Sequence, residues 1–114
     1  MPPREWRLRL TDILESIARI QQYTRGMSLE AFAQDTKTMD AVIRNITIIG
    51  EAARHVPDDI MQRHPQVPWA DMRDTRNILV HVYFGVKTDV LWETIQNDLP
   101  PLVPLLRELL EGGG

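Results

Sequence analysis

Apolar residues recur at steps of three and four positions along most of this chain, and this spacing restricts it to helical folds. Between residues 7 and 23 the apolar positions fall on one side of an ideal helix, while charged and amide side chains fill most of the other side. A second long stretch, from Asp35 or Thr36 to about His55, repeats the pattern. No segment alternates apolar and polar residues as a half-buried strand does. The fold class is therefore predicted to be all-α.

Other helical segments are expected around these two, each marked by a capping residue at its start or by a glycine or proline at its end. They are a short helix over 28–33 capped by Ser28, a turn over 58–63 capped by Asp58 or Asp59, a third main helix from Trp69 toward Val82 ended by Gly85, a fourth from Thr88 or Asp89 to Leu99, and a last helix, kinked or restarted at Pro100, Pro101 and Pro104, that ends at Glu111. Gly50 lies inside the second long helix, where glycine costs about 1 kcal/mol relative to alanine, so we expect it to pack closely against a neighbour.

The predicted architecture is an antiparallel four-helix bundle with an additional short helix. Its 114 residues suffice for one core, so we expect a single domain over 1–111 and a flexible glycine tail over 112–114. No apolar run reaches the roughly 18 residues that span a bilayer, and the first residues lack the apolar core of a signal peptide. We therefore expect a soluble, cytoplasmic protein with no membrane partner.

Charge and cysteine content narrow the chemistry. The sequence has no cysteine, which excludes disulfides and thiolate metal sites. Its net charge of -3 argues against broad, non-specific polyanion binding, which relies on many phosphate contacts. Any nucleic-acid site is therefore expected to be confined to one part of the surface.

One segment combines a permanent cation, an imidazole and a phenol inside an otherwise apolar stretch. It reads Arg76-Asn77-Ile78-Leu79-Val80-His81-Val82-Tyr83. Arginine presents a planar fork of donors that matches phosphate oxygens, and histidine exchanges a proton near neutral pH, so the segment suits chemistry on a phosphodiester. On spacing alone, the alternative is a helix end at which Arg76 and His81 cap the helix or pair with Asp71 and Asp74.

Helix geometry limits how these groups can meet. A five-residue step turns an ideal helix by about 140°, so Arg76 and His81 would not share a face, whereas Tyr83 returns to within about 20° of Arg76. His81 joins them only where the helix loosens or where two chains meet. Cleaving RNA with its own 2'-hydroxyl needs a base, an acid and positive charge near the phosphorus, and one motif supplies one histidine. Two motifs across a symmetric dimer would supply enough groups for metal-free cleavage.

Five segments, in order along the chain, together resemble one known family. They are Ile48-Ile49-Gly50-Glu51-Ala52-Ala53, Val67-Pro68-Trp69, the Arg-x4-His-x-Tyr signature at 76–83, Val90-Leu91-Trp92 and Asp98-Leu99-Pro100. The chain resembles the HEPN-domain superfamily, specifically its HepT-like toxin branch. The resemblance implies a metal-independent endoribonuclease toxin that needs no cofactor and acts on RNA as a homodimer or higher homo-oligomer. It also implies a minimal nucleotidyltransferase (MNT) antitoxin as partner.

The same resemblance implies residue roles. Arg76 would stabilise the charged transition state, His81 would act as acid or base, and Tyr83 would be the site of AMPylation by the antitoxin. AMP on Tyr83 would place bulk and a negative phosphate beside Arg76, where an RNA phosphate has to bind. Asn77 could support the site by orienting His81 or by bonding a phosphate oxygen; a solvated helix residue is the other interpretation.

The remaining polar and aromatic candidates have structural explanations. Arg73 could extend the RNA-binding surface, although pairing with a neighbouring aspartate is the safer expectation. Glu51 is expected to pair with an arginine, such as Arg54 or Arg44, rather than to catalyse. We expect His55 and His64 at the surface with no metal site, and the two tryptophans of the later helices, Trp69 and Trp92, in the core.

Two other functions stay open from the sequence. One is a non-catalytic nucleotide- or RNA-binding partner of a minimal nucleotidyltransferase, and the other is a structural bundle whose motif stabilises a dimer interface. Loss of RNA cleavage on changing His81 would separate the nuclease from both.

Overall fold

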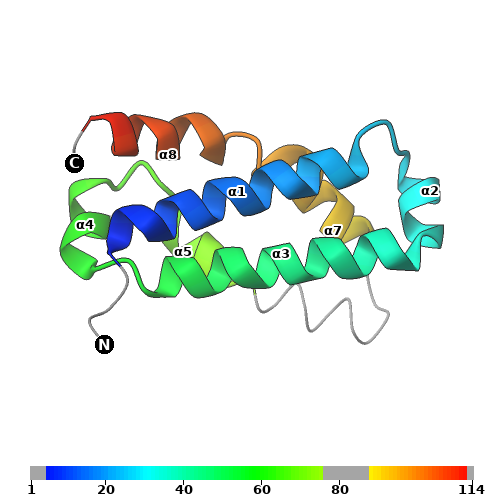
Figure 1. Ribbon diagram of the computed structural model, residues 1–114, viewed down its shortest axis with the longest axis horizontal. Helices are drawn as coiled ribbons and strands as arrows, with labels where there is room; N and C mark the ends of the chain where they lie inside the picture. The colour runs from blue at the N-terminus through cyan, green and yellow to red at the C-terminus, as the bar shows by residue number, and fades with distance from the viewer. Residues whose placement is uncertain (1–4, 76–87, 113–114) are drawn as a thin grey trace.

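Two long antiparallel helices, α1 (Trp6–Thr24) and α3 (Thr36–Arg54), pack against each other along their lengths and carry the other elements (Figure 1). The computed structural model describes residues 5–75 and 88–112. All regular structure in these residues is helical, so the predicted all-α class is confirmed for this part of the chain. The remaining elements are α2 (Leu29–Gln34), α4 (Asp58–Arg63), α5 (Trp69–Arg73), α7 (Thr88–Glu93), the π-helix η1 (Thr94–Asp98) and α8 (Leu102–Glu111).

The link between the two long helices follows from local chemistry. Gly26 has a positive φ of 77°, which lets the chain turn after α1. The Ser28 hydroxyl accepts a hydrogen bond from the backbone N–H of Ala31 at 3.1 Å and caps α2. The Asp35 carboxylate accepts one from the backbone N–H of Thr38 at 3.0 Å and caps α3. The expected starts of both helices are confirmed.

The core lies between α1 and α3 and extends to the later helices. In Figure 1, α2 and α4 lie at opposite ends of the long pair, and α8 runs along α1. Contacts also join α3 to α5, and α2 to both α3 and α7. The core side chains are aliphatic apart from one phenylalanine, one tryptophan and one methionine, and they include Leu10, Ile13, Ile17, Ile20, Phe32, Val42, Ile46, Ile49, Trp69, Met72, Leu91, Leu106 and Leu109.

The predicted third helix is wrong as a continuous element from Trp69. Helix α5 ends at Arg73, and Asp74 and Thr75 form a turn. The backbone N–H of Asp74 bonds to the Ala70 carbonyl at 2.9 Å and closes the last turn of α5. Aspartate and threonine both have low helix propensity, which favours an end at this point. The rest of that prediction, including its end at Gly85, lies outside the described residues.

The other boundaries agree with expectation more closely. Helix α8 restarts after Pro101, whereas Thr88 is the first described residue of α7, so the expected start of that helix is not tested. Asp58 and Asp59 are not caps, because Pro57 occupies that position; their carboxylates lie in the first turn of α4, where they complement the helix dipole. The four-helix arrangement, the domain limits and the homodimer remain predictions. No described helix is long and apolar enough to cross a membrane.

Candidate functional site

The structure describes the two ends of the candidate site rather than its centre. The predicted site residues Arg76, Asn77, His81 and Tyr83 lie outside the described residues, which stop at Thr75 and resume at Thr88. The described frame consists of α5 and the turn after it on one side, and α7 on the other. This frame shows where the chain lies, relative to the long helices, directly before and after the undescribed segment.

Thr75, the residue directly before Arg76, is packed onto α3. Its side chain is buried, and its Oγ1 lies so close to Gly50 that a Cβ at position 50 would collide with it. The Met72 carbonyl oxygen lies 3.5 Å from the same point. The predicted close packing of Gly50 is confirmed, and Thr75 is the neighbour that requires it.

Helix α5 is held in place by its apolar side. Trp69 and Met72 are both buried in the core. The Trp69 indole Nε1 donates a hydrogen bond to the His64 carbonyl at 3.0 Å, so the polar edge of this ring is satisfied. The turn that leads into the motif therefore rests on a helix with a fixed position.

An acidic cavity adjoins Thr75 between α3, α5, η1 and α8. It has a volume of about 500 Å³, and its described lining includes Asp71, Asp74, Asp98 and Asn97. Three carboxylates repel a phosphate group, so this hollow is unfavourable for an anionic ligand.

Arg73 is the described arginine nearest to the motif in sequence, and its side chain is exposed. Within the described chain it forms no ion pair with Asp71 or Asp74, so the expectation that it pairs with one of them is wrong. The reason is helical geometry, because residues one or two positions apart do not face each other. Among the described residues, the Arg73 guanidinium has no acidic partner.

Glu51 acts as a surface partner, as expected. Its Oε2 lies 3.5 Å from Arg54 Nη1, and its Oε1 lies 3.6 Å from His55 Nδ1. The same His55 nitrogen lies 2.8 Å from the Glu51 carbonyl oxygen. All three side chains are about half exposed, so these contacts contribute little to stability.

The histidines and tryptophans outside the motif are placed as follows. His55 is exposed as predicted, whereas His64 is half-buried and its Nε2 has no partner among the residues described. Trp69 lies in the core, and Trp92 packs partly buried with its ring 5.2 Å from that of Phe32, which confirms their structural role. In the described ranges, no three histidine or acidic side chains gather as they would around a metal ion.

Comparison with known proteins gives the family. A family model described as ribonuclease HepT-like matches residues 13–109, a range that includes the whole segment from Arg76 to Tyr83. The chain belongs to the HepT-like ribonuclease family. This HepT-like chain is 46% identical over 93 residues to a protein of Thermococcus cleftensis named "Probable ribonuclease HepT", covering 82% of this chain and 84% of the relative.

Two further relatives of this HepT-like chain carry similar names. It is 37% identical over 111 residues to a "Putative RNase" of Methanocaldococcus jannaschii, covering 97% of this chain and 92% of the relative. It is 34% identical over 102 residues to a "Putative RNase" of Caldanaerobacter subterraneus, covering 90% and 91%. No solved structure matches the chain.

Sequence reasoning missed one residue that shapes the site of this HepT-like chain. Gly50 indicated a close neighbour but not its identity, because Thr75 lies 25 positions away in the sequence. Only the packing of the turn after α5 against α3 brings the two together.

Proposed function

We propose that this HepT-like chain is the toxin of a toxin–antitoxin pair and cleaves RNA as a metal-independent endoribonuclease in the cytoplasm. The observation that carries the proposal is the family match across 13–109, which contains the Arg76-x4-His81-x-Tyr83 motif. The names of the curated relatives, ribonuclease and RNase, support the same activity.

The proposed reaction is an internal transfer at phosphorus. The ribose 2'-oxygen attacks the adjacent phosphorus, its proton passes to a base, and the bond to the 5'-oxygen breaks as an acid protonates that oxygen. The products are a 2',3'-cyclic phosphate and a 5'-hydroxyl end. His81 from two chains supplies base and acid, and Arg76 stabilises the charge on the phosphate oxygens. Asn77 supports the site by orienting His81 or bonding a phosphate oxygen.

We further propose that a minimal nucleotidyltransferase antitoxin silences the toxin by AMPylation of Tyr83. The added phosphate is negative and bulky, so it competes with the RNA phosphate for Arg76. Arg73, three positions before Arg76 and without an ion pair among the described residues, extends the surface that holds RNA.

The decisive experiment is RNA cleavage by the purified chain in EDTA, with Arg76→Ala and His81→Ala beside it. We expect cyclic phosphate ends from the wild type and loss of cleavage by two or more orders of magnitude in both variants. His55→Ala, which removes an exposed histidine outside the motif, is the matched control and should cleave normally. Undiminished cleavage by His81→Ala would contradict the mechanism, and RNA binding without cleavage would favour a non-catalytic partner of the nucleotidyltransferase.

The shared site is tested by mixing. If two chains form one site, an excess of His81→Ala protein should capture wild-type chains in mixed dimers and reduce their specific activity. Unchanged activity after subunit exchange would show that one chain suffices. For the switch, mass spectrometry after incubation with ATP and the antitoxin should find one adenylyl group on wild type and none on Tyr83→Phe.

A further inference from the structure

A groove between the two long helices is lined by polar and aromatic side chains that are not part of the motif. This α1/α3 groove has a volume of about 550 Å³ and is bordered by Arg19 and Tyr23 of α1 and by Asp40, Arg44, Asn45 and Ile48 of α3. Steps of four residues place Arg19 and Tyr23 on one face of α1, and the same step aligns Asp40, Arg44 and Ile48 on α3. The groove thus follows from the antiparallel packing of the two helices.

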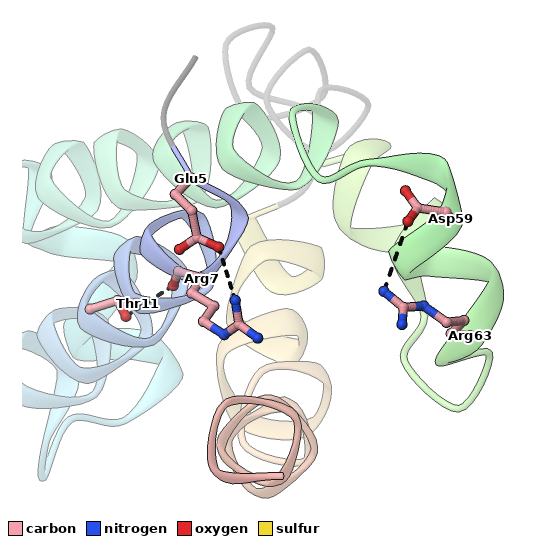
Figure 2. Close-up of polar contacts among 5 residues, drawn as sticks. All are labelled: Glu5, Arg7, Thr11, Asp59 and Arg63. Atoms are coloured by element: carbon pink, nitrogen blue, oxygen red, sulfur yellow. Dashed lines mark hydrogen bonds and ion pairs between the residues drawn. The ribbon is translucent and has the colours of Figure 1, made fainter. Parts of the chain in front are cut away.

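The arginines of the groove differ from several other surface arginines of the molecule. Figure 2 shows Arg7 paired with Glu5 at 3.1 Å and Arg63 with Asp59 at 3.8 Å. Across the residues that the structure describes, Arg19 and Arg44 form no ion pair, although Asp40 lies one turn before Arg44. Two guanidinium groups therefore border the groove without an ion pair to any described residue.

An aromatic ring and a buried amide complete the groove. Tyr23 is 42% exposed, and only Leu8 matches it among the large apolar side chains described. Asn45 is 4% exposed; its Nδ2 donates to the Ala41 carbonyl at 2.9 Å, while its Oδ1 has no partner within the described chain. A buried carbonyl oxygen without a donor costs free energy, so a ligand that brings an N–H group to Asn45 is favoured.

A nucleotide of single-stranded RNA has the matching groups. An unpaired base has a flat face that stacks on tyrosine and N–H donors on its edge, and its phosphates accept from arginine. The carboxylate of Asp40 lowers the net positive charge of the groove to about one, which suits a single nucleotide better than the dense charge of a duplex. Asn45 also lies five residues before Gly50 on α3, about 7.5 Å along the helix axis from the contact with Thr75.

We propose that the α1/α3 groove binds one unpaired nucleotide of the RNA substrate, with its base on Tyr23 and Asn45 and its phosphates on Arg19 and Arg44. The choice of RNA as ligand rests on the proposed function. The groove holds the strand while another part of it reaches the motif, so this site contributes to substrate affinity and not to the chemical step.

The test measures RNA binding separately from cleavage. Fluorescence anisotropy of a labelled, unstructured RNA oligonucleotide is recorded in the His81→Ala background, with Tyr23→Ala or Arg44→Ala added. We expect Tyr23→Ala to raise Kd about tenfold through loss of stacking, and Arg44→Ala to weaken binding and reduce the slope of log affinity against log salt by about one. When the same RNA is a duplex, Tyr23→Ala should leave its Kd unchanged, and Asn45 should not contribute to its binding.

Matched controls come from the same surface. Tyr23→Phe keeps the ring, Leu8→Ala removes an equally exposed apolar side chain of α1, and Arg107→Ala removes an exposed arginine of α8. All three should bind the single strand as the parent protein does. Circular dichroism checks that the Tyr23→Ala and Arg44→Ala proteins remain folded, as expected for exposed positions.

Two results would overturn the proposal. One is an unchanged Kd for the single strand in both Tyr23→Ala and Arg44→Ala. The other is a shift of these variants toward monomer in sedimentation velocity without loss of RNA affinity, which would make the groove a contact between copies of the chain. If the wild type cleaves no RNA but binds it in a way that depends on Tyr23, the groove proposal is supported and the nuclease proposal is contradicted. If the wild type cleaves RNA but Tyr23→Ala and Arg44→Ala bind it with unaltered affinity, the nuclease proposal is supported and the groove proposal is contradicted.

Discussion

The side-chain hydroxyl of Thr75 lies against Gly50, in space that any larger residue at position 50 would enter. Thr75 is the last described residue before Arg76, so this contact fixes where the described chain before the motif lies relative to α3. Glycine in a helix interior costs about 1 kcal/mol relative to alanine, and the close approach of the turn after α5 explains why it is present.

We predict that Gly50→Ala destabilises the protein by about 1 to 3 kcal/mol, because the new methyl group forces Thr75 away from α3. RNA cleavage should fall as well, since the motif begins at the next residue. Urea unfolding gives the free energy, and the cleavage assay gives the activity.

A second substitution tests whether the Thr75 hydroxyl is the cause. Thr75→Ala removes the oxygen that the methyl group would meet, so adding Gly50→Ala in that background should be neutral or stabilising by up to about 1 kcal/mol. Equal destabilisation in both backgrounds would contradict the contact.

The cap of α3 predicts a pH dependence. The pKa of Asp35 is lowered, first by the hydrogen bond from the Thr38 backbone N–H and then by that from the Thr38 hydroxyl. The stabilisation is therefore complete above the pKa of aspartate in the unfolded chain and is lost as pH falls through the lowered pKa of the folded state. Asp35→Ala should lower the Tm at neutral pH, and the difference from wild type should shrink in acid.

Thermal unfolding over a pH series measures this difference. Asp35→Asn is the matched control, because asparagine caps a helix but does not titrate in this range. A gap between wild type and Asp35→Ala that stays constant into strong acid would disprove the role of the charged carboxylate.

Arg73 is predicted to bind RNA through its guanidinium, which forms no ion pair within the described part of the chain. Arg73→Ala should raise the KM for RNA about fivefold with little change in kcat, because the residue contacts the strand before and during the reaction alike. Arg54→Ala removes an arginine that is already paired with Glu51, so it should leave KM unchanged. Steady-state cleavage at two salt concentrations decides the matter, and equal KM values for the two variants would reject the assignment.

Phe32 connects α2 to the helix that follows the motif. Its side chain is fully buried and its ring lies 5.2 Å from that of Trp92 on α7. Phe32→Ala should cost about 3 to 5 kcal/mol and lower the Tm sharply, as deletion of a core aromatic does. Tyr23→Ala, an exposed aromatic on α1, should change stability by no more than about 0.5 kcal/mol. Similar Tm values for these two variants would contradict the assigned core.

Local signals explain which parts of the fold were predictable. Ser28 and Asp35 cap helices through side chains that reach only three residues ahead, so the starts of α2 and α3 could be predicted from the sequence. The low helix propensity of Asp74 and Thr75 favours an end of α5 but does not fix it, because the packing of Thr75 against a glycine 25 positions earlier gives no local signal. The π-helix η1 gave no signal in the apolar spacing either; its bond from the Leu99 N–H to the Thr94 carbonyl spans five residues.

The candidate site also has a part that the sequence predicts and a part that it does not. The motif from Arg76 to Tyr83 is contiguous and is therefore visible in the sequence, whereas the α1/α3 groove joins Tyr23 to Asn45 across two helices whose alignment the sequence does not state. Arg73 is near Asp71 and Asp74 in the sequence but does not face them on the helix surface, so the sequence wrongly suggests an ion pair with one of them.

The aspartates around the cavity beside Thr75 make one direction of approach unfavourable for a polyanion. A polyanion that comes from the side of η1 meets Asp71, Asp74 and Asp98 first, whereas one that comes along α3 passes Arg44. If the chain binds RNA as proposed, the strand is expected to lie along α3 rather than over the carboxylates beside Thr75.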